Sequence, residues 1–307
     1  MIELVAGIDG GQSSTIAVIG DERGAILGRG VAGPADEVGE KPDSTRLRDA
    51  LRDSLDRARA AAGLPKTTRF VAIVAGISGY EGRIYGAQPD LATDRLVLTH
   101  DAPIAHAGAL AGEPGVVVIA GTGSVVYAVD QRGRSKMFGG WGYLFGDEGS
   151  AFYIAREALV YLMHQHDGGL ENGSAQVLQA APEACAFFGV DSLRELARAF
   201  YSGQITRSVL ASYAPEALKV PLLRKIARNG ARQLARFVQK AAGGSAAPKI
   251  ALLGGVFIDD RTRHYLCKLI MLGCPGAQIV EPVHEPAAGA LLLAYRELGL
   301  HVPELRK

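Results

Sequence analysis

The feature of this chain that most limits its fold is a pattern of short apolar runs and turns that occurs twice. The first copy has its runs and turns at residues 4–8, 9–13, 16–19, 21–24 and 25–30. The second copy has them at residues 116–119, 121–124, 125–129, 130–133 and in a run toward Phe138. Each run has the length of a strand, and the first two runs of each copy are rich in the β-branched residues that strands favour. The repeat therefore predicts two similar halves that face each other, each offering one glycine turn.

The polar turn after the first run of each copy is rich in glycine. The two turns read Asp9-Gly10-Gly11-Gln12-Ser13 and Gly121-Thr122-Gly123-Ser124. Glycine lets neighbouring backbone N–H groups point into one small space, which suits the oxygens of a phosphate. Taken alone, either turn is explained equally well by an ordinary glycine-rich hairpin, so the choice depends on the rest of the chain.

Asp101 follows a short strand predicted at 96–99 and precedes a helix predicted at 104–110. Upstream, a helix is predicted over 44–62 and a buried strand over 70–75, which ends in a turn containing Ser78 and Gly79. This order is typical of parallel strands with crossover helices. Ligands of such sheets bind beyond the carboxyl ends of the strands, which makes Asp101 a candidate functional residue. The alternative is that Asp101 caps the helix that follows it.

Residues 139–151 contain five glycines and the chain's only tryptophan, Trp141. A helix interior does not tolerate that glycine content, so a loop is predicted, followed by a helix over 152–164. Asp147 then lies near the start of that helix. Either it caps the helix, or it is a rigidly held carboxylate that accepts hydrogen bonds from hydroxyl groups.

The remainder of the chain carries weaker signals. Residues 173–243 are predicted to be largely helical and to contribute core packing, with no identifiable chemistry. Gly254 and Gly255 follow a strand predicted at 249–253. A helix over 261–272, a short strand at 279–280 and a helix over 287–298 are predicted after them. On helix 44–62, a solvated charged face is expected, formed by Arg48, Arg52, Asp53, Asp56, Arg57 and Arg59.

Composition excludes several classes of function. The chain has 307 residues, enough for two domains, and a net charge of +1, which gives no reason to expect a nucleic-acid partner. No apolar stretch is long enough to span a membrane, and no signal peptide is recognisable. The three scattered cysteines, Cys185, Cys267 and Cys274, fit a reducing cytoplasm best. A metal at the His164/His166 pair is not expected.

Together, Asp9-Gly10-Gly11, the GTGS turn and Gly254-Gly255 resemble the two phosphate motifs and the adenosine motif of the actin-like ATPase and sugar-kinase superfamily. Within it, His100-Asp101 and residues 139–151 (GGWGYLFGDEGSA) resemble the N-acetylglucosamine kinase and BadF/BadG ATPase group, which includes broad-specificity archaeal hexokinases. The resemblance implies an α/β fold of duplicated, ribonuclease H-like type. It implies one lobe from residues 1–108 with 285–307, another from 109–284, and a cleft between them.

The resemblance also implies roles for individual residues. Asp101 would be the catalytic base that takes the proton of a sugar 6-hydroxyl, and Asp9 would lie near Mg²⁺, through water. The nucleotide ATP would be held by Asp9, Gly10, Gly11, Gln12, Ser13, Thr122, Gly123, Gly254 and Gly255. The sugar would be bound by Asp36, Ser78, Gly79, Ser124, Val125, Gly140, Trp141, Gly142 and Asp147. A homodimer is implied as well.

Three departures from the family pattern bear on this interpretation. Gln12 replaces a third glycine, and Ser13 replaces a threonine, which keeps a hydroxyl in a less free loop. Asp36 stands where the family carries an asparagine that binds sugar hydroxyls. A carboxylate only accepts hydrogen bonds, so the sugar stays open among N-acetylglucosamine, glucosamine and glucose.

The sequence also bears on other classes of function. The chain lacks GxxxxGK[ST], which disfavours a P-loop kinase, and GTGSVV continues as a strand instead of a helix, which disfavours a dinucleotide fold. An activator ATPase with a cysteine-bound iron–sulfur cluster and a non-catalytic sugar sensor remain as alternatives to the kinase.

Overall fold

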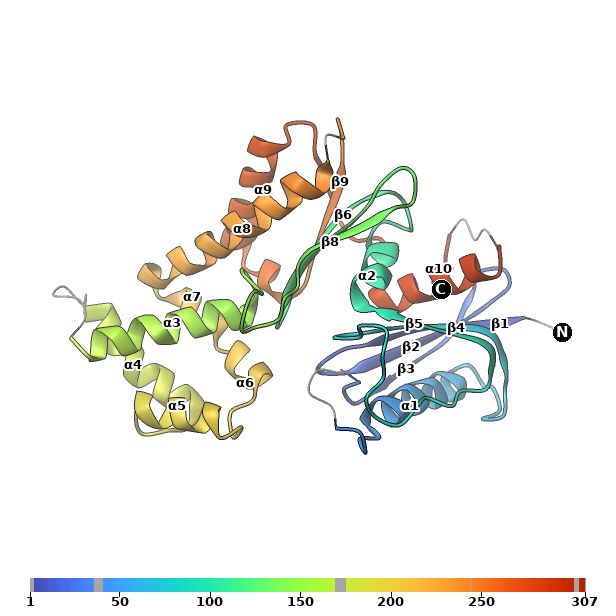
Figure 1. Cartoon of the computed structure of the whole chain (residues 1–307), viewed down its shortest axis with the longest axis horizontal. Coiled ribbons are helices and arrows are strands. Elements are labelled where there is room, and N and C mark those ends of the chain that lie inside the picture. Colours follow the sequence, from blue (N-terminus) through green and yellow to red (C-terminus); the bar gives the residue numbers. More distant parts are fainter. Residues whose placement is uncertain (1–2, 36–40, 169–174, 244, 301–303, 307) are drawn as a thin grey trace. The chain divides into compact units, whose positions relative to one another are not determined.

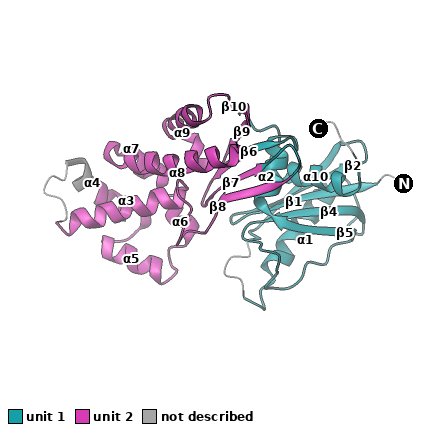
Figure 2. Ribbon diagram, turned by 45° about the horizontal axis from the view of Figure 1, so that its top comes forward, with its two compact units in different colours: residues 1–117, 129–133, 281–307 teal, residues 118–128, 134–280 magenta. Residues whose placement is uncertain are grey.

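The computed structural model describes residues 3–35, 41–168, 175–243, 245–300 and 304–306. The chain divides into two compact units (Figure 2). Residues 1–117, 129–133 and 281–307 form the first, and residues 118–128 and 134–280 form the second.

The first unit is built on a five-stranded sheet with helices on both faces (Figure 1). Its strands run in the order β3-β2-β1-β4-β5, in which β1, β4 and β5 are parallel and β2 and β3 are antiparallel. The strands are β1 (Leu4–Gly10), β2 (Thr15–Asp21), β3 (Ile26–Ala32), β4 (Phe70–Ile77) and β5 (Thr93–His100). The helices are α1 (Arg46–Ala61), α2 (Asp101–Ala109) and α10 (Pro286–Glu297).

The second sheet repeats this plan, in the order β10-β9-β6-β7-β8. Its strands are β6 (Gly115–Ala120), β7 (Ser124–Val129), β8 (Ser135–Gly139), β9 (Lys249–Leu253) and β10 (Gln278–Val280). Each strand takes the place of its counterpart in the first sheet, so the predicted duplication is confirmed. The α-helices are α3 (Ala151–His166), α4 (Ala175–Phe188), α5 (Leu193–Tyr201), α6 (Arg207–Ala211), α7 (Ala214–Lys219), α8 (Arg224–Ala242) and α9 (Asp260–Gly273). The second unit also contains the 3₁₀ turns η1 (Pro221–Leu223) and η2 (Gly255–Ile258).

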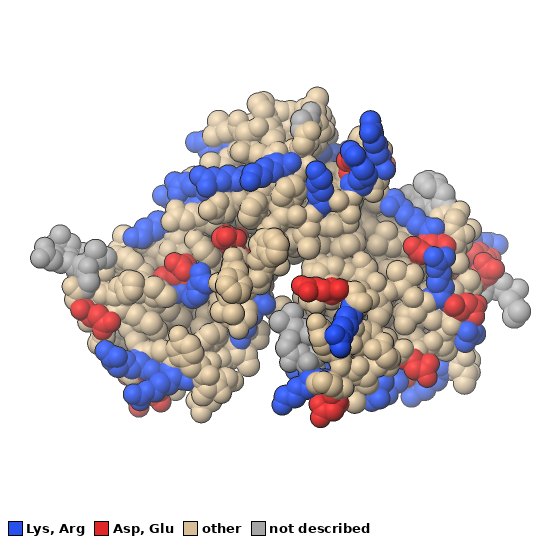
Figure 3. Space-filling model, viewed as in Figure 1, with Lys and Arg blue, Asp and Glu red and all other residues tan. Residues whose placement is uncertain are grey.

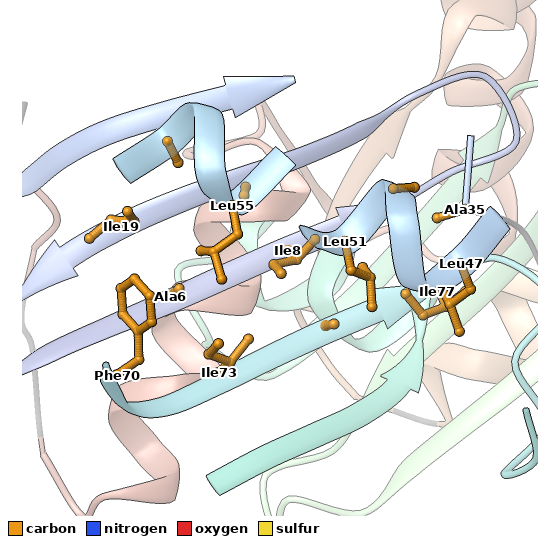
Figure 4. Close-up of a cluster of buried hydrophobic side chains, with 14 residues drawn as sticks. Ala6, Ile8, Ile19, Ala35, Leu47, Leu51, Leu55, Phe70, Ile73 and Ile77 are labelled. Atoms are coloured by element: carbon orange, nitrogen blue, oxygen red, sulfur yellow. The ribbon is translucent and has the colours of Figure 1, made fainter. Parts of the chain in front are cut away.

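Alternating residues of β1 build two separate cores in the first unit. Ala6 and Ile8 lie under α1, where Leu51 and Leu55 are fully buried (Figure 4). Val5 joins the opposite core with α10. Because side chains alternate across a strand, one apolar run such as 4–8 supplies both faces of a fully covered sheet.

Two glycines of β3 allow α1 to pack closely on the sheet. A Cβ atom at Gly28 would overlap the carbonyl oxygen of Ala58, and one at Gly30 would overlap that of Ser54. The helix backbone therefore lies directly against the strand. This contact fixes the height of α1 above the sheet.

Arg59 is not on a solvated face, contrary to the sequence-based expectation. Its side chain is buried, donates to Asp56 and to the carbonyl of Thr68, and lies over the ring of Phe70. The last turn of α1 brings it against the loop that leads into β4. The periodicity of the helix could not reveal this, because the burying surface comes from outside the helix.

A row of basic side chains follows α8 on the face seen in Figure 3. The helix has no acidic residue, and its basic residues are Arg224, Lys225, Arg228, Arg232, Arg236 and Lys240. A net charge near zero therefore coexists with a locally basic surface. Among the described helices, none is both long and apolar enough to cross a bilayer.

We expect Gly30→Ala to lower the free energy of unfolding by about 1–3 kcal/mol, because the added methyl group forces α1 away from β3. Gly33→Ala is the matched control, since a Cβ there would meet nothing within 4 Å. Urea unfolding of both variants measures the difference. Equal stabilities would show that α1 adjusts without cost.

Candidate functional site

The carboxyl ends of β1, β4 and β5 meet at one edge of the first sheet. In the strand register Asp9 pairs with Gly76, and Gly76 pairs with Thr99. The N–H of Ser78 also donates to the carbonyl of Gly10 at 2.9 Å. The register thus brings residues 9–10, 78–79 and 100–101 together within the first unit, although they come from three distant parts of the chain.

Asp101 is the first residue of α2 and does not cap it. The N-cap is His100, whose Nδ1 accepts the N–H of Ala102 at 3.2 Å. The helix therefore does not need the Asp101 carboxylate, and the capping interpretation of this residue is wrong. The same Nδ1 lies 2.7 Å from Oδ1 of Asp101. A neutral His100 that accepts from Ala102 cannot also donate there, so the two contacts compete for one nitrogen.

The electrostatics of this edge are dominated by carboxylates. The pKa of Asp9 is raised from 3.8 to about 7, first by burial and then by the charges of Asp101 and Glu285. For His100, burial lowers the pKa, but the hydrogen bond and charge of Asp101 and the charge of Glu81 outweigh it, and the net shift is upward. The edge therefore favours bound positive charge.

Glu285 was missed by the sequence analysis. It is the N-cap residue of α10, and its carboxylate pairs with Arg29 of β3 at 3.1 Å. The available signal was the pair Glu285-Pro286, since proline is typical of the first turn of a helix. Nothing in the sequence, however, placed that helix end near Asp9.

The first glycine turn is held by its carbonyl groups. Ala35 donates its N–H to the carbonyl of Gly11 at 3.1 Å, and the Thr15 hydroxyl donates to Gly33 at 2.7 Å. The N–H groups of Gln12 and Ser13 have no acceptor in the described part of the chain. These two N–H groups are therefore available to an anion. Asp36, a predicted sugar contact, lies outside the described residues.

The second glycine turn, in the second unit, has the same property. Ala151 donates its N–H to Gly121 at 2.8 Å, and the Ser124 hydroxyl donates to the carbonyl of Glu148 at 2.8 Å. Within the residues that the structure describes, the N–H groups of Thr122 and Gly123 find no acceptor. The turn is thus fixed by the start of α3, with two backbone donors left over.

Gly254 belongs to the surroundings of this second turn. Its φ is +107°, and a Cβ would overlap the carbonyl oxygen of Ala120, the residue before the turn. Both facts require glycine at this position. Gly255 begins η2, and a Cβ there would meet nothing within 4 Å, so close packing does not explain it.

Asp147 is buried beside the second turn and is not a helix cap. The N-cap of α3 is Ser150, whose hydroxyl accepts the N–H of Tyr153 at 3.0 Å. Asp147 Oδ1 instead accepts the N–H of Ser124 at 3.1 Å, and Oδ2 accepts from Arg207 at 2.6 Å. Burial raises the pKa of Asp147, and the bonds from Ser124 and Arg207 oppose the shift.

The loop before Asp147 is shaped by glycines. Gly140 and Gly142 have φ of +71° and +78°, and a Cβ at Gly140 would lie 3.2 Å from the side chain of Val125. The side chain of Trp141 between them is 77% exposed. The structure therefore groups Ser124, Val125 and residues 140–147 within one unit, with Trp141 open to solvent.

The model of the BadF/BadG/BcrA/BcrD ATPase family matches residues 6–294. The chain belongs to this family. The match covers both glycine turns and both Asp101 and Asp147, and it confirms the family resemblance. A family of ATPases implies that the chain binds ATP.

Relatives of the chain include kinases of amino sugars. It is 29% identical to the N-acetylmuramic acid/N-acetylglucosamine kinase of Clostridium acetobutylicum, over 66% of this chain and 68% of that protein. It is 25% identical to the N-acetyl-D-glucosamine kinase of Dictyostelium discoideum, over 95% of this chain and 98% of that protein. The chain also matches a solved structure from Chromobacterium violaceum with a TM-score of 0.75 and 26% identity, over 95% of this chain and 99% of that one. N-acetylglucosamine kinase activity has been suggested for that protein. The expected actin-like fold is confirmed.

The carboxylate edge gives a prediction for Asp9→Asn. An unfolded Asp9 loses its proton near pH 4 and the folded one near pH 7, so the free energy of unfolding of the wild type falls as the pH rises between these values. Three pH units correspond to about 4 kcal/mol. We therefore expect the difference in free energy of unfolding between the variant and the wild type to rise by about 4 kcal/mol, in favour of the variant, from pH 4 to pH 8. Urea unfolding without nucleotide or divalent cation measures it. Parallel pH profiles would show that Asp9 is ionised at neutral pH in the folded protein.

Proposed function

We propose that the protein is an ATP-dependent kinase that phosphorylates the 6-hydroxyl of a hexose or an amino sugar. The observation that carries the proposal is the meeting of Asp9 and Asp101 at the ends of parallel strands, next to a turn with two backbone N–H groups that have no acceptor among the described residues. The family and the activities of the two named kinases support it. The second turn, whose Thr122 and Gly123 N–H groups find no acceptor among the described residues, is also suited to phosphate.

In the proposed reaction, Asp101 accepts the proton of the 6-hydroxyl as that oxygen attacks the γ-phosphorus of ATP, and the bond from this phosphorus to the β–γ bridging oxygen breaks to release ADP. Phosphoryl transfer depends mainly on position and charge neutralisation. The backbone N–H groups of Gln12 and Ser13, and of Thr122 and Gly123, hold phosphate oxygens. Gly254 and Gly255 let the adenosine approach the backbone.

Mg²⁺ fits the carboxylate edge. Burial is the first cause of the raised pKa of Asp9, and the charges of Asp101 and Glu285, which a cation would neutralise, add to it. No three His, Cys, Asp or Glu residues among those described are grouped closely enough to hold a metal themselves. Asp9 would therefore act through water, with phosphate oxygens as the other ligands, which is typical of Mg²⁺. When bound, the ion neutralises charge on the phosphates.

The sugar is proposed to contact Ser78, Gly79 and Asp36 of the first unit, and a set of residues of the second unit: Ser124, Val125, Gly140, Trp141, Gly142 and Asp147. N-acetylglucosamine, glucosamine and glucose are the candidates from the sequence. The relative from Clostridium acetobutylicum adds N-acetylmuramic acid. A homodimer is proposed on the family resemblance.

The family's description as ATPases favours one second candidate, an ATPase that needs no sugar acceptor. A coupled assay of ADP release separates the two, run with each of the four sugars and without sugar. We expect turnover only when sugar is present and sugar 6-phosphate as the product. ADP release at the same rate without sugar, or iron in the purified protein, would favour the activator-type ATPase.

We expect Asp101→Asn to lower kcat by about 10²–10⁴-fold, because the amide cannot take the hydroxyl proton. Binding of ATP and sugar should be retained, since the side chain keeps its size. Asp94→Asn is the control, because Asp94 lies at the exposed start of β5, the strand that leads to Asp101, and pairs with Arg69. Steady-state kinetics and calorimetric binding measure both variants. Unchanged kcat in Asp101→Asn would remove this residue from the mechanism.

A further inference from the structure

Arg207 reaches the second glycine turn from a part of the chain that was expected to contribute packing alone. It is the first residue of α6, a short helix that packs against α3 and buries Leu210 and Ala211. The side chain is 18% exposed, whereas that of Asp147 is 5% exposed. Together they form an almost buried ion pair with Nη2 and Oδ2 2.6 Å apart.

The guanidinium group is held in place by aromatic rings as well as by the carboxylate. It lies 5.2 Å from the ring centroid of Tyr143 and 5.8 Å from that of Phe152. Such cation–π contacts are strongest where water is excluded. Arg207 therefore has one well-defined position, fixed by α3, by the loop before it and by Asp147.

The pair lies directly on the glycine turn. A Cβ at Gly123 would be 2.8 Å from Nη2 of Arg207 and 3.1 Å from Oδ2 of Asp147. The other oxygen of Asp147 accepts the N–H of Ser124. A chain of two hydrogen bonds thus links Arg207 to the residue that follows Thr122 and Gly123, whose own N–H groups are free within the described chain.

The charge of Arg207 also determines whether Asp147 stays ionised and accepts the N–H of Ser124. Burial raises the pKa of Asp147, and Arg207 opposes that shift. Removing one member of a buried ion pair leaves the other charge uncompensated in a medium that disfavours it. Without Arg207, Asp147 would take up a proton or move, and the N–H of Ser124 would lose a charged acceptor.

We propose that Arg207 is a positioning residue for phosphate binding: through Asp147 it fixes the 121–124 turn so that the N–H groups of Thr122 and Gly123 stay directed at a nucleotide phosphate. This inference rests on the phosphate role of the turn under the proposed function. It does not depend on which acceptor receives the phosphoryl group, and nucleotide binding can test it without kinase activity.

The test compares the affinities of Arg207→Met for a non-hydrolysable ATP analogue with Mg²⁺ and for adenosine, by calorimetry and by competition. Methionine keeps apolar contact with the two rings and removes the charge. We expect the affinity for the ATP analogue to fall about tenfold while the affinity for adenosine is unchanged. General damage to the unit would weaken both ligands alike, and that outcome, or an unchanged affinity for the analogue, would overturn the proposal.

Three further variants sharpen the test. Arg207 holds Asp147 through a single Nη bond, and its Nε has no acceptor among the described residues, so Arg207→Lys should recover most of the affinity. Asp147→Asn should lose as much affinity for the ATP analogue as Arg207→Met does. The double variant should lose no more affinity than either single variant, because the pair acts as a unit. Losses that multiply would show that Arg207 does not act through Asp147.

Arg194→Met is the matched control, since Arg194 and Asp167 are 3.7 Å apart, both well exposed, on the same helical part of the second unit. It should bind both ligands as the wild type does. Should Arg207→Met not fold, Arg207→Lys and Asp147→Asn still decide the question. If the wild type binds the ATP analogue but phosphorylates no sugar, the proposed function fails, and the inference about Arg207 is judged on binding alone.

Discussion

The register of the three parallel strands β1, β4 and β5 is the constraint on which the rest of the first unit depends. Asp9, Gly76 and Thr99 lie side by side in that register, so three loops begin at one edge of the sheet. A shift by one residue would turn every side chain to the other face. The two cores hold the register, because Ala6 and Ile8 belong under α1 and Val5 under α10.

The two edges that carry candidate chemistry differ in their charge balance. In the first unit, the charges of Asp101 and Glu285 add to burial in raising the pKa of Asp9, while Glu285 pairs with Arg29 and Asp101 lies beside His100. In the second unit, the buried carboxylate of Asp147 is neutralised by Arg207. The first arrangement suits a bound cation, and the second suits a rigid frame for backbone donors. Both follow from the cost of burying a carboxylate without a partner.

The glycines around these sites serve different purposes. Gly254 is required by its φ and by its contact with Ala120, and Gly123 by the guanidinium beside it. Gly121 has an ordinary φ and open space where its Cβ would be. Glycine-rich motifs that look alike in a sequence therefore contain positions with unequal tolerance to substitution.

The sequence by itself determined the duplicated arrangement of strands, because the apolar runs, the glycine turns and the turns at 21–24 and 130–133 are local signals that recur in order. It also placed Asp9 and Asp101 at strand ends, and the family match covers both. Only the tertiary structure decided the roles that depend on distant partners. Asp101 and Asp147 were each expected to be possible helix caps, yet His100 and Ser150 take those positions. The pair Glu285-Pro286 indicated a helix start but not its neighbours, and Arg207 gave no signal, since a charged residue next to an apolar helix face is interpreted as a surface residue until another segment is known to cover it.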